Sequence, residues 1–323
     1  MLGRLVLSDE DEEEEKERSN LVEDDSALSS RVGGTLRFNE PQKDTSEIET
    51  IRTWSKTSQC SSSSSGDMSS PKRSSQRVTF EIVSAKTVSQ TRKKFVSYTV
   101  LIKRVPGLER QPGVLERRYT DFLHLYQSLK KHFPSVLNDF PFPKKALLGN
   151  FTAEVITERS VAFQHLLAYI FSISELRQSI EVAEFFYNRE LQDAHKMMKV
   201  GQFEDASVIL ENVYFVQEKL LGEDHFSTYY TLCILIACLN AVDNISEAQK
   251  YAEIALLYVS KYIKSDLTVP LMVLSIRLWW AVGKDKRDLE KRVQEMKKNG
   301  INVEKQPTLL ELVLHRECPL VQN

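Results

Sequence analysis

The sequence predicts an α+β domain with a three-stranded antiparallel sheet at residues 75–190, followed by an all-α region at residues 191–323. Two observations lead to this fold class. Three segments between residues 77 and 119 alternate polar and apolar side chains with the period of two that half-buried strands show. From about residue 119 onward apolar residues recur with helical spacing, and beyond residue 190 every periodic segment is helical.

The first 74 residues are predicted to be a disordered acidic and serine-rich tail. They contain an acidic run from Asp9 to Glu15, a serine tract from Ser61 to Ser65, and few regularly spaced apolar residues. A segment of this composition cannot bury enough apolar surface to offset the entropy lost on folding.

Composition favours a reducing, cytosolic compartment. The 323-residue chain is 41% hydrophobic, yet no apolar run approaches the roughly 18 residues that a membrane span needs, so any membrane contact should be peripheral. The N-terminus lacks the basic and apolar parts of a signal peptide. Four scattered cysteines suggest neither a zinc site nor a disulfide framework: Cys60, Cys233, Cys238 and Cys318.

Net charge is uneven along the chain. It is −6 over residues 1–74, +6 over residues 75–190 and −2 over residues 191–323. A basic middle part is attracted to an anionic surface, because each Lys or Arg near such a membrane contributes about 1 kcal/mol before screening by salt. On charge alone, nucleic acid would be an equally good partner.

The middle part should begin with strands and continue with helices. The strands are expected at Arg77–Val83, Phe95–Ile102 and Val114–Tyr119. The next helix places on one face Phe122, Leu125, Tyr126 and Leu129. A loop follows around Pro141 and Pro143, since proline forbids a regular helix there. Further helices are expected at Thr152–Phe171 and Val182–Tyr187.

The sharpest signal is the segment Arg117-Arg118-Tyr119-Thr120-Asp121-Phe122. It resembles the R-R/K-Y-x-x-F signature of PX domains, the phosphoinositide-binding modules of sorting nexins and phagocyte oxidase subunits. The resemblance covers about residues 75–190, with strands, proline loop and helices in the family's order. Recognition of an inositol phosphate needs a planar fork of donors, an aromatic wall and further cations, and this part of the sequence offers all three.

The resemblance implies a role for each matching residue. Arg118 would grip the 3-phosphate, Tyr119 would pack on the inositol ring, and Thr120 would add contacts at a helix start, which suits an anion. Lys145, two residues past the last loop proline, would bind the 1-phosphate with Lys144 beside it. Arg159 would hold the distal hydroxyls or phosphates. The alternative for Arg118 is a surface salt bridge.

Two neighbouring features of this region are less settled. Arg117 should point to the opposite side of its strand from Arg118, which makes it structural or solvated. The loop reads Pro141-Phe142-Pro143 where the family usually has P-x-x-P, so the lipid preference stays open, although the resemblance favours phosphatidylinositol 3-phosphate.

An apolar stretch after the loop is a candidate for insertion into the bilayer. Partial burial of Leu147, Leu148 and Phe151 in lipid would add about 1–3 kcal/mol each. The alternative is that Leu147 or Phe151 packs on its own domain.

The C-terminal region resembles tetratricopeptide repeats. Gly201-Gln202-Phe203-Glu204-Asp205-Ala206 and Asn244-Ile245-Ser246-Glu247-Ala248 lie about 43 residues apart, and the linker Leu221–His225 between them is similar to repeat linkers of kinesin light chains. A PX domain followed by such repeats resembles one small subgroup of sorting nexins. Core positions are expected at Leu232, Cys233, Leu235, Ile236, Cys238, Leu239, Trp279 and Trp280.

These features predict an adaptor and no enzyme. The six histidines form no metal-binding or Cys-His pattern and no cofactor loop is present, so no catalytic residue, metal or cofactor is expected. No nucleic-acid-binding signature accompanies the basic segment. The expected function is endosomal protein sorting on early endosome membranes, with the helical region binding a protein cargo or adaptor. Two alternatives stay open: a scaffold whose PX-like fold binds lipid weakly or not at all, and a helical region that only stabilises its neighbour.

Overall fold

The computed structural model describes residues 77–90, 93–105, 111–146 and 149–316. The expected disordered tail at residues 1–74 lies outside these ranges, as do Cys60 and Cys318.

The chain begins its described part with a three-stranded antiparallel sheet of order β1-β2-β3. The strands are β1 (Arg77–Gln90), β2 (Lys93–Val105) and β3 (Gly113–Arg118). All three predicted strands are therefore present. β1 and β2 extend beyond the predicted segments and form a long hairpin, so the basic residues Lys93 and Lys94 belong to β2.

A β-bulge explains why the first strand looks short in the sequence. The pairing with β2 shifts between Ile82 and Ser84, which inserts Val83 as an extra residue. Before the bulge Phe80 and Ile82 face the core, and after it the buried residue is Ala85. The strict alternation of the sequence pattern is interrupted at this point, although the strand continues.

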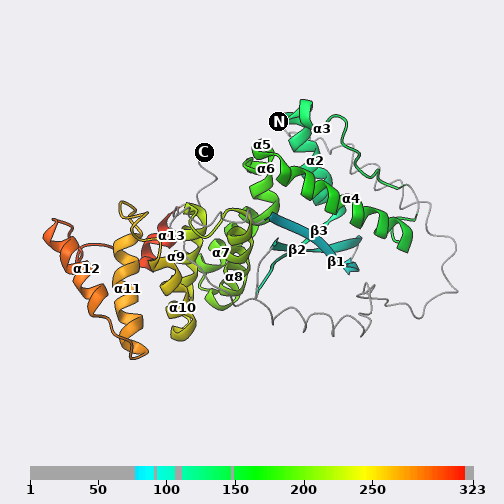
Figure 1. Cartoon of the computed structure of the whole chain (residues 1–323). Helices are drawn as coiled ribbons and strands as arrows, with labels where there is room; N and C mark the ends of the chain where they lie inside the picture. The colour runs from blue at the N-terminus through cyan, green and yellow to red at the C-terminus, as the bar shows by residue number, and fades with distance from the viewer. Residues whose placement is uncertain (1–76, 91–92, 106–110, 147–148, 317–323) are drawn as a thin grey trace, which may run out of the picture. The chain divides into compact units, whose positions relative to one another are not determined.

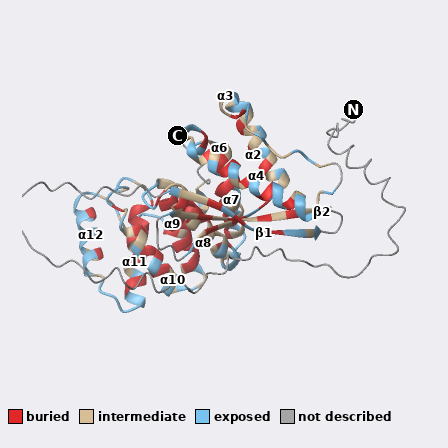
Figure 2. Ribbon diagram, turned by 45° about the vertical axis from the view of Figure 1, so that its right-hand side comes forward, coloured by how far each residue is buried: buried red, intermediate tan, exposed pale blue. Residues whose placement is uncertain are grey.

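Helices pack over one face of this sheet (Figures 1 and 2). They are α2 (Tyr119–His132), α3 (Pro134–Leu137), α4 (Ala153–Ser172), α5 (Ser174–Arg177) and α6 (Ile180–Ala183). The Phe122 ring of α2 stacks on the Phe163 ring of α4, with their centroids 3.9 Å apart, and Tyr98 of β2 meets both rings edge-on. This aromatic cluster holds the two helices and the sheet together.

The helix predicted at residues 182–187 is part of a longer helical run. α6 continues into a π-helical turn, η2 (Glu184–Asn188), and then into α7 (Arg189–Lys199). Ala183, Asn188 and Arg189 all have right-handed helical backbone angles. The expected boundary at residues 190/191 thus falls inside α7, and no loop separates the two regions.

Three helix pairs of similar design form the C-terminal region. Its elements after α7 are α8 (Phe203–Leu220), α9 (Phe226–Ala241), α10 (Ile245–Leu256), α11 (Thr268–Ala281), α12 (Arg287–Lys298) and α13 (Leu309–His315). The second helices of the three pairs begin at Phe203, Ile245 and Arg287, so each starts 42 residues after the second helix of the preceding pair. The sequence revealed only two of these pairs.

The same turn ends the first helix of every pair. A left-handed residue stands two positions past each helix end: Gly201, Asp243 and Gly283. The next N–H in each case donates to the carbonyl five residues back, as in Gln202 N to Met197 O at 2.9 Å. This is the Schellman arrangement, and its recurrence confirms the repeat character of the region.

The predicted helical core is correct apart from one residue. The positions expected on α9, from Leu232 to Leu239, are all buried (Figure 2). Trp279 of α11 is buried as well, whereas Trp280 is 74% exposed, so its assignment to the core was wrong. Consecutive residues of a helix point about 100° apart, so one of two adjacent tryptophans faces outward.

Candidate functional site

Arg118 lies where β3 meets α2, at the surface. Its side chain is 52% exposed, and it is the N-cap residue of α2. Its backbone N–H donates to the Asp121 carboxylate at 2.9 Å, and its guanidinium Nε lies 3.8 Å from the same carboxylate. The guanidinium carbon is 5.9 Å from the ring centroid of Phe95 on β2. The motif arginine therefore has one acidic neighbour and an open side toward solvent.

Tyr119 joins the motif to the proline loop. Its hydroxyl donates to the Pro143 carbonyl at 2.9 Å, and its ring packs against that of Phe142. The guanidinium of Arg159, from α4, stacks over the Tyr119 ring at 4.3 Å from its centroid. Burial raises the pKa of the Tyr119 hydroxyl, and the charge of Arg159 opposes that rise. One aromatic ring thus links the strand, the loop and α4.

Arg159 is a buried cation with incomplete hydrogen bonding. It is 5% exposed, and its Nη2 donates to the Asn150 carboxamide oxygen at 2.8 Å. Its Nε and the hydroxyl of Tyr98 next to it have no further hydrogen-bond partner among the described residues, so the two groups depend on each other. Burial raises the pKa of Tyr98, while the positive charge of Arg159 lowers it. A buried donor left unsatisfied costs about 1–3 kcal/mol, so this side chain is suited to an additional acceptor.

The loop lysines extend the basic character of the site. Lys144 and Lys145 follow Pro143, and both are exposed. Within the described ranges neither side chain forms a hydrogen bond or an ion pair with the protein. Because Tyr119 holds the Pro143 carbonyl, the start of this lysine pair is anchored beside the aromatic ring.

The structure connects most of the predicted site residues. Arg118 and Tyr119 are adjacent in the chain, Arg159 stacks on Tyr119, and the lysine loop hydrogen-bonds to Tyr119. Thr120 is the second residue of α2 and exposed, but no described contact joins its side chain to the others. Its place in the first turn leaves its N–H free of intrahelical bonds, which is the property that suits an anion.

The candidate insertion segment is described only in part. Leu147 and Leu148 lie outside the described residues. Phe151 is 42% exposed, and the Lys94 ammonium lies 4.9 Å from its ring centroid. Phe151 is thus partly exposed and also contacts Lys94 of its own domain, so insertion into the bilayer and packing on the domain both stay predictions for this residue.

Sequence patterns did not reveal two residues that shape the site. Asn150 accepts from Arg159 and donates to the Ala146 carbonyl at 2.7 Å, so it ties both ends of the loop segment to the buried cation. Asp121 is the third residue of α2 and accepts from the Arg118 N–H. An acid at this helix position was a readable signal of helix capping, whereas Asn150 gave none.

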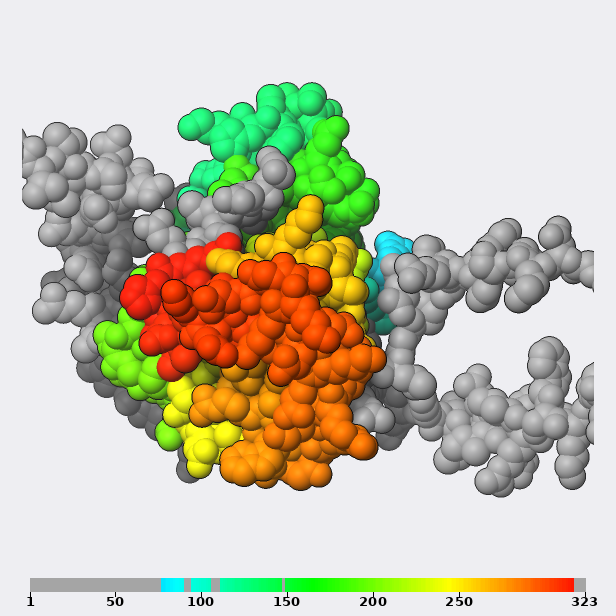
Figure 3. Space-filling view, turned by 90° about the vertical axis from the view of Figure 1, so that its left-hand side faces the viewer, coloured from blue at the N-terminus to red at the C-terminus, as the bar shows by residue number. Residues whose placement is uncertain are grey.

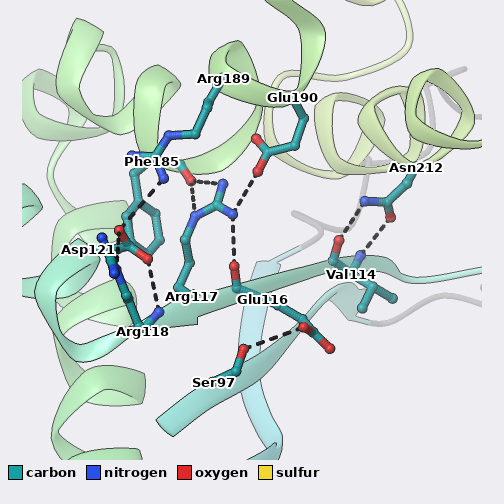
Figure 4. Close-up of polar contacts among 10 residues, drawn as sticks. All are labelled: Ser97, Val114, Glu116, Arg117, Arg118, Asp121, Phe185, Arg189, Glu190 and Asn212. Carbon is teal, nitrogen blue, oxygen red and sulfur yellow. Dashed lines mark hydrogen bonds and ion pairs between the residues drawn. The ribbon is translucent and has the colours of Figure 1, made fainter. Parts of the chain in front are cut away.

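Arg117 has a structural role, as one of the two predicted alternatives states. It is 5% exposed and lies on the opposite side of β3 from Arg118. Its Nε donates to the Phe185 carbonyl at 2.8 Å, and its Nη1 lies 2.7 Å from the Glu190 carboxylate of α7 (Figure 4). The first arginine of the motif thus binds the helical run instead of a ligand.

The described part of the chain contains neither a metal-ligand cluster nor a helix that could span a membrane. No group of three or more His, Cys, Asp or Glu side chains there is arranged to hold a metal ion. No described helix has the length and apolar content of a membrane span.

Comparison with known proteins identifies the family. The sequence profile of the PX domain matches residues 105–189. Bovine sorting nexin-20 is 34% identical over 219 residues, which cover 68% of this chain and 69% of that protein. The chain belongs to the PX-domain sorting nexins. Mouse sorting nexin-21 is 32% identical over 242 residues, 74% of this chain and 66% of its own length, so the match spans just under two thirds of that relative.

The extent of the matches separates two groups of sorting nexins. Mouse sorting nexin-16 is 33% identical, but over only 98 residues, 30% of this chain. The matches to sorting nexins 20 and 21 are far longer than the PX-domain profile and therefore include part of the helical region.

Proposed function

We propose that this chain is a cytoplasmic adaptor of endosomal sorting that binds phosphatidylinositol 3-phosphate on early endosomes and has no enzymatic activity. In this proposal Arg118 grips the 3-phosphate, Tyr119 carries the inositol ring, Thr120 adds a contact at the start of α2, and Lys145 binds the 1-phosphate with Lys144 beside it. Arg159 binds the distal hydroxyls.

The state of Arg159 is the observation that supports this pocket best. Within the described part of the chain no carboxylate forms an ion pair with it, and its polar neighbours are the neutral side chains of Asn150 and Tyr98. A buried, unpaired cation is costly for a protein to maintain. Hydroxyl and phosphate oxygens of an inositol headgroup would offset that cost, because they accept hydrogen bonds beside the Tyr119 ring on which Arg159 stacks.

Membrane contact next to the pocket would strengthen headgroup binding. Phe151 is exposed after the lysine loop, and Lys94 lies against its ring. Together with Leu147 and Leu148 it forms the proposed inserting segment, in which apolar side chains enter the bilayer and lysines stay at the headgroups.

The helical region is proposed to bind a protein cargo or adaptor. A cavity of about 640 Å³ opens between α9, α11, α12 and the segment before α13, with mainly apolar lining that includes Val273, Leu274 and Leu310. Trp280, near the C-terminal end of α11, is exposed. Figure 3 shows the C-terminal helices α11 to α13 in orange to red. Exposed tryptophans and apolar pockets are typical of protein-binding surfaces.

Co-sedimentation of the full chain with vesicles tests the lipid proposal. Phosphatidylcholine vesicles would each carry a single phosphoinositide, and the salt concentration would be varied. We expect binding to be selective for phosphatidylinositol 3-phosphate and to be lost in Arg118→Ala, whereas Arg292→Ala, at an exposed position of α12, should behave as wild type. Weak, unselective binding that salt removes would contradict the pocket.

Localisation in cells distinguishes the lipid-binding adaptor from the alternative, a scaffold recruited by a protein partner. If the PX domain recruits the chain, Arg118→Ala should release it from early endosomes. Unchanged endosomal localisation of this variant would favour recruitment by a protein partner through the helical region.

A further inference from the structure

Two arginines from different parts of the fold meet at one carboxylate. The Oδ1 atom of Asp121 lies 3.8 Å from Arg118 Nε and 3.6 Å from Arg189 Nη1 (Figure 4). Arg118 belongs to the PX motif, whereas Arg189 is the first residue of α7. The Asp121 side chain is only 16% exposed, and both arginines are more than half exposed.

The start of α7 is held firmly against β3. Glu190, next to Arg189, forms the ion pair with buried Arg117, next to Arg118. Arg117 also donates twice to the Phe185 carbonyl of η2. Arg117 at the end of the strand therefore holds Glu190 at the start of the helix, and the position of the neighbouring Arg189 follows from this contact.

The next helix, α8, contacts β3 at the other end of the strand. The Asn212 side chain of α8 accepts from the Val114 N–H at 3.1 Å and donates to the Val114 carbonyl at 2.6 Å. Gly113 lies so close to α8 that an added Cβ would meet the Val216 Cα at 3.0 Å. The strand that ends in Arg118 is thus positioned by the helical region along its length.

Asp121 poses an electrostatic problem for a phosphate-binding arginine. Its negative charge attracts the Arg118 guanidinium and repels an anionic headgroup approaching that side chain. A second cation at the same carboxylate offsets both effects. Arg189 is placed for this task, because its nearest ion-pair partner in the described chain is Asp121 itself.

We propose that Arg189 is a positioning residue of the phosphoinositide site, which neutralises Asp121 and so leaves Arg118 available to the lipid phosphate. The proposal rests on the lipid-binding function proposed above and extends it. It makes the first helix of the C-terminal region part of the lipid-binding unit, and it assigns Arg189 an effect through Asp121 without contact to the lipid.

A double-mutant cycle in the full chain tests this role. Arg189→Ala, Asp121→Asn and the double variant would be compared with wild type on phosphatidylcholine vesicles carrying phosphatidylinositol 3-phosphate. We expect Arg189→Ala to weaken binding about two- to five-fold, the range of an exposed ion pair. Asp121→Asn should bind at least as well as wild type. In the double variant, Asp121→Asn should cancel the loss of affinity that Arg189→Ala causes alone. Arg189→Lys should restore most of the affinity.

Controls separate this mechanism from simpler ones. Lys196→Ala, which removes a charge from an exposed position of α7, should bind as wild type. Circular dichroism and thermal melting would show that each variant is folded. A loss in Arg189→Ala that Asp121→Asn does not cancel would mean that Arg189 contacts the lipid directly, and it would overturn the proposal.

Failure of this inference and failure of the proposed function give different results. Selective wild-type binding that Arg118→Ala abolishes and Arg189→Ala leaves unchanged would overturn the role of Arg189 alone. Absence of headgroup-selective binding by the wild type would overturn both.

Discussion

The PX domain and the helical region use their basic residues in different ways. In the PX domain two arginines, Arg117 and Arg159, are buried, and the exposed Lys144 and Lys145 form no ion pair in the described chain. Ion pairs with surface carboxylates form at Lys103, Arg118 and Arg189 of the PX region. They are more frequent among the described residues of the helical region: Lys250 with Glu247, Lys261 with Asp224, Lys284 with Glu253, Lys286 with Glu290, Arg287 with Asp285, Arg292 with Asp288, Lys297 with Glu304 and Arg316 with Asp266.

This difference in ion pairing is a better indicator of an anion-binding region than net charge is. Exposed ion pairs contribute little to stability, but in each pair the carboxylate neutralises a cation that could otherwise bind an external anion. A lysine without a carboxylate partner keeps that charge. The two regions contain similar numbers of basic residues, 17 at residues 75–190 and 16 at residues 191–323. Among the described residues, a larger share of those in the helical region is paired with a carboxylate.

The largest expected effect is on stability, at the buried arginine of the PX domain. Arg117→Ala would leave the Glu190 carboxylate and the Phe185 carbonyl without their buried partner. We expect a loss of about 3 kcal/mol in the free energy of unfolding, the range for a broken buried ion pair. Urea denaturation followed by circular dichroism measures it.

The matched control lies in the helical region. Lys284→Ala removes a surface ion pair with Glu253 and should cost less than about 0.5 kcal/mol. Equal losses in the two variants would remove the distinction between buried and surface cations drawn here.

A second prediction concerns the unpaired lysines. The double variant Lys144→Ala/Lys145→Ala should lose about 2 kcal/mol of membrane-binding free energy, or about 30-fold in affinity, since each lysine near an anionic surface contributes about 1 kcal/mol. Vesicle co-sedimentation at constant salt measures the change. Lys250→Ala/Lys261→Ala, which removes two paired lysines, should bind as wild type; a similar loss there would show that only total charge matters.

The smallest effect concerns a turn of the repeats. Asp243 has a φ of 58°, in the left-handed region, at the position that glycine occupies after α7 and α11. Asp243→Gly should stabilise the chain by about 0.5–1 kcal/mol, because glycine adopts this conformation without steric cost. Thermal unfolding would show a higher midpoint. Gly201→Asp, the reverse change at the equivalent turn, should lower it.

Local patterns predicted most of the fold. The strands, α2, α4 and the first two helix pairs each combine a clear apolar period with turn residues, so a sequence window is enough to place them. The third pair was missed because Lys286-Arg287-Asp288 stands where the other two pairs have a phenylalanine or isoleucine near the helix start. The bulge at Val83 hid the second half of β1, since it depends on pairing with β2.

The candidate site was predictable only where a motif fixes it. Arg118, Tyr119 and the loop lysines were predicted from short segments and Arg159 from the family resemblance, and the structure places Arg159 on the Tyr119 ring. Asn150 and Arg189 could not be found this way. They act through neighbours that are distant in sequence, and no local spacing encodes such contacts.

The contact of Asn212 with Val114 has a consequence for self-association. β3 is an edge strand, and an edge with free N–H and carbonyl groups can recruit a strand from another molecule. Here the Asn212 carboxamide occupies both groups of Val114, and Arg117 donates to the Glu116 carbonyl at 2.9 Å. The repeats therefore also protect the PX sheet from polymerising through this edge, a protection that a fragment ending at residue 190 would lack.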